Sequence, residues 1–238
     1  MTLNRRTWLA AATATVLGAV GACAGAATAN SAAAPTGLVV WDFDDQTPPG
    51  MALLPMAERA WLRRALGEQV AQALDQLPGL VLVDRMRVAE LLAEQQLGSS
   101  ALADQDARLR LGRLVGARRM VFGGFFALGD QVQINLRLVD VASGRIEHAD
   151  EVTAPSGDTM AASAALGPRL IRVLGGAGGA LAAYPEAVWR QLDAALALAE
   201  QKKYDAALTA LQALLAEHPG FVPAERQVPR VLERMRRQ

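Results

Sequence analysis

The acidic residues that follow the first apolar run are the best candidates for catalysis in this sequence. Residues 37–43 (GLVVWDF) are rich in β-forming types, and Asp42 and Asp44 stand two positions apart at the end of this run. Two aspartates at a strand end can provide a nucleophile and a general acid for phosphate ester hydrolysis where Mg²⁺ is bound. Such a site needs a further acidic pair or a lysine at another strand end, and none stands at a convincing position.

The aspartate pair also matches the motif of haloacid-dehalogenase-type phosphatases, although only in part. The fourth residue after Asp42 is Gln46, where that motif has Thr or Val. A motif without its structural context is weak support for an activity. We therefore expect these aspartates to lie solvated in a loop, and a Mg²⁺-dependent phosphatase-like hydrolase is kept as an alternative.

Histidine and cysteine are too scarce for other familiar kinds of site. The chain has two histidines, His148 and His218, and one cysteine, Cys23. A cysteine or histidine metal cluster is therefore excluded, and no cofactor is expected. Arg5 and Arg6 are the only charges in residues 1–34, so 22 Lys and Arg remain against 24 Asp and Glu, a net charge of −2. This balance argues against nucleic-acid binding, which needs a basic surplus.

Residues 1–34 have the pattern of an export signal followed by a tether. Arg5 and Arg6 precede an uncharged apolar stretch over 8–22, which is shorter than a membrane-spanning helix requires. The run Val20-Gly21-Ala22-Cys23 resembles a lipobox, so we expect lipidation of Cys23, an outer-membrane anchor and a periplasmic location. Plain cleavage after Ala29 is the alternative, and both Sec and twin-arginine export remain open.

The mature sequence predicts an α/β fold, a mixed sheet with packed helices. In the helix expected over 58–77, apolar residues recur at helical spacing, and Arg63, Arg64, Glu68, Gln72 and Asp75 occupy the other face. Gly129-Asp130 suits a type II′ hairpin turn, after which Val132, Ile134, Leu136 and Leu138 alternate with polar residues. Strands are expected over 37–43, 80–83, 119–128, 132–138 and 145–153, and further helices over 85–97, 104–115 and 158–174.

The glycine run at 175–179 (GGAGG) predicts a domain boundary. It lacks the lysine of a phosphate-binding loop, and we interpret it as a linker. Helices are expected beyond it over 189–201, 204–217 and 225–237. The predicted organisation is a signal and tether over 1–34, an α/β domain over 35–174, a linker over 175–183 and a helical segment over 184–238.

Three segments together resemble the family of the curli secretion component CsgG, the peptidoglycan-synthase activator lipoproteins and the TolB N-terminal domain. They are LVLVDRMRVAELLAEQQLGSS, LGRLVGARRMVFGGF and INLRLVDVASGRI, within residues 37–154. The resemblance implies an anticodon-binding/TolB-N-like fold and a non-enzymatic adaptor in envelope assembly or secretion. Its expected partners are other envelope proteins and further copies of the chain. A pore-forming secretion channel subunit is a second alternative, although the tight turns at 129–130 and 142–144 leave no room for inserted strands.

Residues 192–219 resemble one tetratricopeptide-type helix pair. A plain helical hairpin is the alternative interpretation, and a single unit leaves apolar helix faces uncovered. The segment must therefore pack on the first domain, on the last helix or on another chain. We expect partner contacts at Tyr204 and Leu211 in this segment and at Arg118 and Arg119, where the CsgG family more often has an acidic or polar residue.

Overall fold

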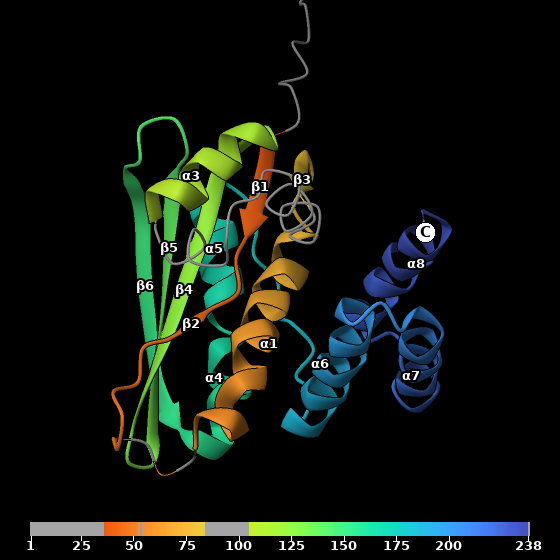
Figure 1. The fold of residues 1–238 in the computed structure, drawn as a ribbon. Helices are drawn as coiled ribbons and strands as arrows, with labels where there is room; N and C mark the ends of the chain where they lie inside the picture. Colours follow the sequence, from red (N-terminus) through yellow and green to blue (C-terminus); the bar gives the residue numbers. More distant parts are fainter. Residues whose placement is uncertain (1–35, 52, 54, 84–104, 238) are drawn as a thin grey trace, which may run out of the picture. The chain divides into compact units, whose positions relative to one another are not determined.

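An open, mixed β-sheet forms the centre of the protein (Figure 1). The computed structural model describes residues 36–51, 53, 55–83 and 105–237. The sheet order is β3-β1-β4-β5-β6, and β2 pairs with β4 off this path. The strands are β1 (Thr36–Val40), β2 (Asp44–Asp45), β3 (Leu80–Leu82), β4 (Ala117–Leu128), β5 (Gln131–Asp140) and β6 (Ile146–Pro155). β1 is parallel to β3 and β4, whereas β4, β5 and β6 form an antiparallel meander. The mixed sheet predicted from the sequence is confirmed.

The meander is held by the two turns that the sequence predicts. Leu128 pairs with Gln131, and Gly129 has φ +58° while Asp130 is not in the positive-φ region, as a type II′ turn requires. In the second turn, the Asp140 carboxylate accepts hydrogen bonds from the amide and the hydroxyl of Ser143, at 2.8 and 2.7 Å. The four alternating apolar residues of β5 are all buried, which confirms the predicted register.

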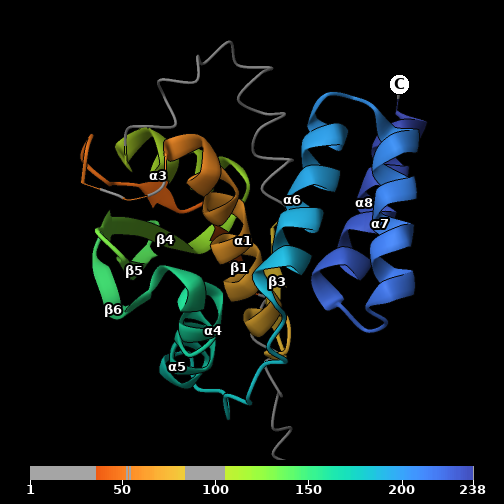
Figure 2. The same cartoon turned by 90° about the horizontal axis from the view of Figure 1, so that it is seen from below.

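Each face of the sheet has its own apolar core. One core joins Leu38, Val121, Phe125 and Ile134 to the apolar side of α1 (Met56–Leu74). The other joins Val39, Trp41, Met120, Phe122 and Val139 to Leu109 and Leu111 of α3 (Gln105–Leu114). Figure 2 shows α3 on one side of the meander and α4 and α5 on the other. β1 is buried on both faces, which is why its sequence is continuously apolar rather than alternating.

The single helix predicted over 158–174 is divided in the structure. A 3₁₀ turn at Ser156–Asp158 leads into α4 (Thr159–Ser163), and α5 (Leu166–Val173) follows after a break at Ala164 and Ala165. Gly176 then lies against the fold, where an added Cβ would stand 2.4 Å from Leu77 Cδ1 and 2.6 Å from Ile171 Cγ2. Close packing thus requires this glycine, which the sequence pattern indicated only as part of a linker.

The tail consists of α6 (Glu186–Glu200), α7 (Tyr204–Glu217) and α8 (Val222–Arg236). α6 and α8 begin three residues before their predicted starts, next to Pro185 and at Pro223, because proline is well tolerated at a helix start. Phe221 is buried between Trp189 and Tyr184, with ring centroids 5.1 and 4.6 Å away. The tail therefore has a small aromatic core of its own, which continues into the core beneath the sheet.

Part of the polar side of α1 does not face solvent, contrary to what its amphipathic pattern indicates, although Arg63 and Asp75 are exposed. Glu68 and Gln72 are each only 5% exposed because α6 and α8 pack against this side of the helix.

The described helices include none long and apolar enough to cross a membrane. The helix predicted over 85–97 and residues 1–35 lie outside the described residues, and the predicted domain boundaries stay a prediction.

Candidate functional site

Asp44 and Asp45 form ion pairs with arginines and lie in a short strand, so for Asp44 the expectation of a solvated loop is wrong. Both carboxylate oxygens of Asp44 accept hydrogen bonds from Arg108 of α3, at 2.9 and 3.1 Å. Asp45 binds Arg59 of α1 at 2.9 Å, with both side chains 9% exposed. Asp44 and Asp45 also form β2, whose backbone pairs with Gly124 and Phe125 of β4. The sequence could not show these ion pairs because the arginines lie 64 and 14 positions away.

The Arg108 guanidinium also joins α3 to the sheet through aromatic rings. Its central carbon lies 5.6 Å from the Trp41 ring centroid and 5.9 Å from that of Phe122. These two rings are stacked in parallel planes. Such cation–π contacts add to the ion pair with Asp44. These contacts of Arg108 fix α3 against the sheet, which is a structural role.

Asp42 stands in a different environment from Asp44. It lines a cavity of about 20 Å³, room for one water molecule, together with Glu68 of α1 and Arg226 and Arg230 of α8. Asp44 is instead engaged by α3. The nucleophile and acid of a phosphatase must converge on one substrate, so this arrangement does not favour the hydrolase alternative. Among the described residues, no group of three or more His, Cys, Asp or Glu is placed to hold a metal ion.

Arg118 and Arg119, predicted to contact partners, differ in their surroundings. Arg118 is exposed on β4. Arg119 is half-buried, and its Nε lies 2.6 Å from a carboxylate oxygen of Glu147 on β6. Of the two, Arg118 has the more accessible charge, and their role in partner binding stays a prediction.

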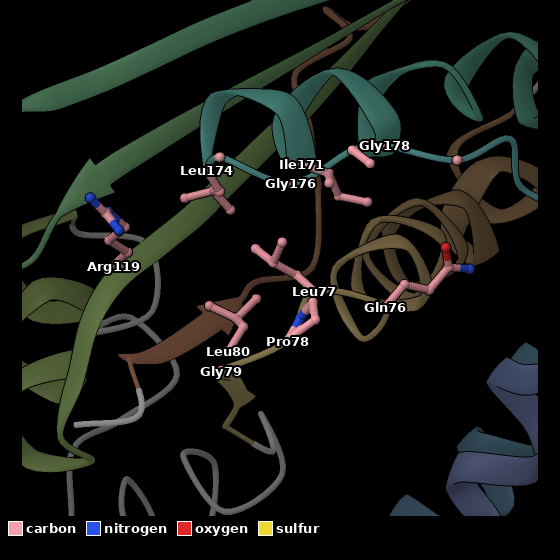
Figure 3. Close-up of a pocket in the computed structure, with 13 residues that line it drawn as sticks. Gln76, Leu77, Pro78, Gly79, Leu80, Arg119, Ile171, Leu174, Gly176 and Gly178 are labelled. Atoms are coloured by element: carbon pink, nitrogen blue, oxygen red, sulfur yellow. The ribbon is translucent and has the colours of Figure 1, made fainter. Parts of the chain in front are cut away.

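Arg119 also lies where two grooves meet at one end of the sheet. The first, of about 610 Å³, runs between the C-terminal turn of α1 and β3 on one side and α5 with the glycine run on the other (Figure 3). The second, of about 590 Å³, continues along Asp140, Arg145 and Glu147. Arg119 and Leu174 line both grooves. The sequence offered one signal for this feature, the glycine run, which we interpreted as a linker.

Two carboxylates in the structure have shifted pKa values. Hydrogen bonds from Ser143 lower the pKa of Asp140 in the second groove. Burial raises the pKa of Glu186, the first residue of α6, with Asp158 adding to the increase and Arg190 opposing it. Glu186 lines a small cavity with Trp61 of α1 and Thr159 of α4, at the place where the tail meets the first domain.

The two residues predicted to bind partners in the tail contribute mainly to its packing. Leu211 of α7 has no exposed surface, so it could affect partner binding only through the packing of the tail. Tyr204 begins α7 and is half-buried against the core. Lys202, just before it, has φ +62°, which closes the tight turn between α6 and α7. Whether either residue contacts a partner stays a prediction, and Cys23 lies outside the described residues.

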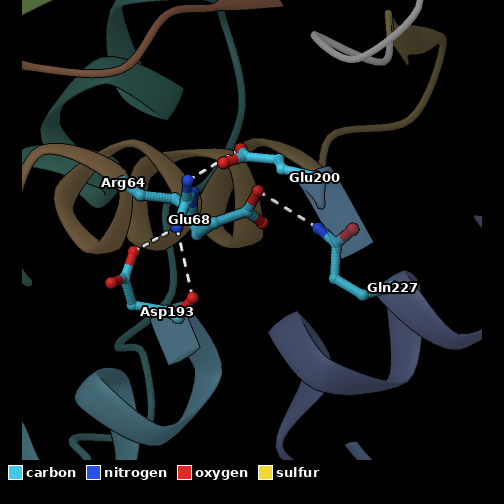
Figure 4. A network of polar contacts seen from close by, with 5 residues as sticks. All are labelled: Arg64, Glu68, Asp193, Glu200 and Gln227. Atoms are coloured by element: carbon cyan, nitrogen blue, oxygen red, sulfur yellow. Dashed lines mark hydrogen bonds and ion pairs between the residues drawn. The ribbon is translucent and has the colours of Figure 1, made fainter. Parts of the chain in front are cut away.

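The contact between α1 and the tail contains several ion pairs and charged hydrogen bonds. One Arg64 nitrogen donates to the Asp193 carboxylate and another lies 2.7 Å from Glu200, both on α6 (Figure 4). One turn further along α1, Glu68 accepts hydrogen bonds from Gln227 at 3.1 Å and Arg226 at 3.3 Å, both on α8. Arg190 of α6 lies over the Trp61 ring, 4.5 Å from its centroid. No pattern in the sequence indicated these pairs.

Large apolar side chains are exposed at the opposite end of the meander from the two grooves. Leu128 at the tip of β4, and Met51, Leu53 and Met56 before and at the start of α1, are at least half exposed. The Gly129 amide donates to the Met51 carbonyl at 2.9 Å, which joins the loop to the hairpin tip. This tip is a second candidate surface for partners.

Comparison with known proteins gives one family match. Residues 22–132, 111 of the 238, match the model of the family described as the curli production assembly/transport component CsgG. No curated protein matches the sequence.

Solved structures give distant likenesses. The LpoB C-terminal domain from Salmonella enterica is 17% identical with TM-score 0.38, over 51% of this chain and 84% of that one. Lipoprotein GNA1162 from Neisseria meningitidis is 16% identical with TM-score 0.39, over 59% of this chain and 95% of that one. The PelC dodecamer from Paraburkholderia phytofirmans is 14% identical with TM-score 0.35, over 61% and 89%. Since all three TM-scores lie below 0.5, these likenesses extend neither to partners nor to assembly.

The family match includes Cys23 of the predicted lipobox, β1, α1 and β4, and it ends at the start of β5. The rest of the meander follows directly in the same sheet. The resemblance that the sequence shows to the CsgG family is therefore confirmed over residues 22–132.

Proposed function

We propose that this protein is a non-enzymatic envelope lipoprotein that acts as a binding adaptor in assembly or secretion. The observation that carries the proposal is the match of residues 22–132 to the CsgG family, which is described as a component of curli production, assembly and transport. Asp44 and Asp45 are engaged in ion pairs within the fold. This arrangement supports a structural use of these carboxylates rather than a catalytic one, in agreement with a non-enzymatic role.

The proposed anchor is the lipidated Cys23. The matched segment begins at Ala22, so the lipobox cysteine falls inside it. A lipid on Cys23 would hold the folded part at the periplasmic face of the outer membrane, with residues 24–35, which are mostly small, as the tether.

The anchor can be tested by the mass of the mature N-terminus and by cell fractionation. We expect an acylated Cys23 and a protein in the outer-membrane fraction. The Cys23→Ala variant should lose the acyl chains and leave the membrane, while a Ser31→Ala control in the same segment should not. An unmodified chain that starts at Asn30 would contradict the anchor and place the protein free in the periplasm.

The proposed partner surface is the end of the sheet around Arg118 and Arg119. Arg118 precedes Arg119 in β4 and has an exposed charge. Two grooves meet at Arg119, and half-exposed Val173 and Ile146 lie at the second groove. Charge combined with apolar surface is the usual composition of a protein-binding patch.

Photo-crosslinking in cells tests this surface. A photoreactive residue at position 118 should form adducts with envelope proteins. The double change Arg118→Glu and Arg119→Glu should abolish co-purification of these partners, whereas Arg236→Glu at the exposed end of α8 should not. Partners that bind the double variant as well as the wild type would remove this surface from the proposal.

The adaptor role further implies that the protein does not hydrolyse phosphate esters. Assays with p-nitrophenyl phosphate and Mg²⁺ should show no turnover above buffer. Turnover that disappears in the Asp42→Asn variant would favour the hydrolase instead.

A further inference from the structure

The first and last helices of the tail both pack against α1. α6 and α8 both contact α1, and α7 packs against α6 and α8 (Figure 2). One helix of the first domain therefore occupies a surface formed by two helices of the tail. This is the geometry of a helix bound in a groove, here formed within one chain.

The side of α1 that occupies this surface has a defined chemistry. Trp61, Arg64 and Glu68 follow at spacings of three and four, which places them along one side of the helix. Arg64 meets acidic partners on α6, whereas Glu68 meets Arg226 and Gln227 on α8 (Figure 4). The two charges of α1 have opposite signs and so do their partners. Reversal of the helix or a shift by one turn would bring like charges together, so the contact is specific for this helix in this register.

The contact is more polar than the interior of either part. In the described structure, Nε of Arg64 and both Nε and Nη1 of Arg226 are buried without a hydrogen-bond partner, as are the indole nitrogens of Trp61 and Trp189. Buried polar atoms without partners weaken a contact relative to an apolar core. The tail is thus docked by matched charges in addition to the apolar contact that joins its core to the core beneath the sheet.

The connection to the tail is held at its start. Residues 174–185 contain no helix or strand, and Gly176 packs against Leu77 and Ile171 of the first domain. The seven residues over 179–185 that follow this packed turn reach about 23 Å when extended. For a connection this short, the effective concentration of the tethered partner is of millimolar order.

We propose that the tail also docks between copies of this chain, with the tail of one copy on α1 of a second copy and the reverse. Each copy carries one α1 and one tail, so a closed pair satisfies every contact that the single chain makes. Within the described residues, α1 packs on the first and last helices of the tail, and a second copy presents the same helix. This inference does not depend on the CsgG match or on the proposed function.

Complementary charge reversal tests the exchange. One variant carries Arg64→Glu, and a second carries Asp193→Arg together with Glu200→Arg. In either variant alone, like charges oppose docking within the chain and between identical copies. In an equal mixture, the exchanged pair brings opposite charges together at both contacts. Native mass spectrometry should therefore show a heterodimer in the mixture and monomers in each separate sample.

The three changes combined in one chain are the matched control. This chain restores opposite charges internally, and it should melt within a few degrees of the wild type and remain folded. A folded triple variant together with a mixture that stays monomeric overturns the proposal. Dimers that form equally well from either variant alone also overturn it, since they would not use this contact.

The wild-type chain provides a second measurement that needs no variant. Trans docking competes with the tethered contact as the protein approaches about millimolar concentration. Isotopically heavy and light copies should be mixed at that concentration. Sedimentation should then show dimers, and native mass spectra should show dimers that contain one heavy and one light copy. A wild-type chain that stays monomeric at that concentration excludes the exchange, whatever the variants do.

Discussion

The sheet core and the α1–tail contact are built on opposite principles, although both bury the same helix. On one side, α1 packs Leu66, Val70 and Leu74 against apolar strand residues that are almost wholly buried. On its other side it places Arg64 and Glu68 against charged residues of α6 and α8. Apolar burial is strong but does not discriminate between partners of similar shape, whereas matched charges contribute less energy and more specificity.

The comparison indicates which part of the molecule sets its stability and which part sets its contacts. Loss of an apolar side chain from the sheet core should affect the whole fold. Loss of a charge from the α1–tail contact should release the tail and leave the sheet intact. The following predictions separate these two effects, in order of decreasing size.

The largest effect is expected from Phe125→Ala in β4. Phe125 is fully buried between the sheet and α1, and truncation of a buried phenylalanine costs about 3–5 kcal/mol through lost burial and the cavity left behind. Thermal and denaturant unfolding should each show a single transition, and its midpoint should be lowered by the same amount for every probe. Phe126→Ala, next in the strand and only half-buried on the other face, is the control with a smaller shift. Equal shifts would mean that the core does not lie where we describe it.

A smaller but substantial effect is expected from Glu68→Ala. The change leaves Arg226 and Gln227 without their carboxylate partner in a buried place, and an uncompensated buried polar group costs about 1–3 kcal/mol. Hydrogen exchange should increase in α6 and α8 before it increases in β4 and β5. Glu225→Ala, an exposed glutamate of α8, is the control and should leave exchange unchanged. Uniform loss of protection would show that tail and sheet unfold as one unit.

The sequence predicted the sheet better than the contacts between its parts. The alternation in β5 and the glycine turns specify the meander locally, so strand order and register could be anticipated there. The two-residue strand β2 was missed because it is defined by backbone pairing with β4 and not by any side-chain pattern. The split between α4 and α5 was also missed, since alanines at the break are good helix formers.

The candidate site was less accessible to sequence reasoning. The ion pairs of Asp44 and Arg64 join residues 64 and 129 positions apart, and a single sequence gives no sign of which charges meet. A polar helix side is normally solvated, so burial of Glu68 and Gln72 could be seen only with the tail in place. A single helix pair needs a covering surface, which predicted that the pair over 192–219 packs on the first domain, on the last helix or on another chain. In the structure α1 of the first domain and the last helix, α8, both pack on it.

Arg64→Ala should give an effect of about 1 kcal/mol, because its partners Asp193 and Glu200 remain partly exposed and solvent can replace the lost pairs. Proteolysis in the connection over 174–185 should become faster, while the melting temperature of the sheet changes little. The effect should shrink in high salt, where the wild-type pairs are screened. Arg118→Ala, an exposed arginine outside this contact, should not change the cleavage rate. If both variants are cleaved at the wild-type rate, the charged pairs do not hold the tail.

The smallest effect concerns pH and Glu186 at the start of α6. Burial raises the pKa of this carboxyl in the folded protein, Asp158 raises it further and Arg190 lowers it. A carboxyl with a raised folded-state pKa binds protons more tightly when folded than when unfolded, so its charged form opposes folding at neutral pH. That cost falls as the pH decreases through the raised pKa, and docking of α6 should become tighter in this range.

Glu186→Gln should therefore slow proteolysis of the connection slightly at pH 7 and remove this part of the pH dependence. Arg59 and Glu58 of α1 line the same cavity and remain unchanged in the variant, so any residual slope belongs to groups other than Glu186. Glu217→Gln, an exposed glutamate at the end of α7, is the matched control and should keep the wild-type profile. A Glu186→Gln variant that is cleaved faster than the wild type at pH 7 would show that the charged carboxylate stabilises the docked tail, and the assignment of this side chain would then be wrong.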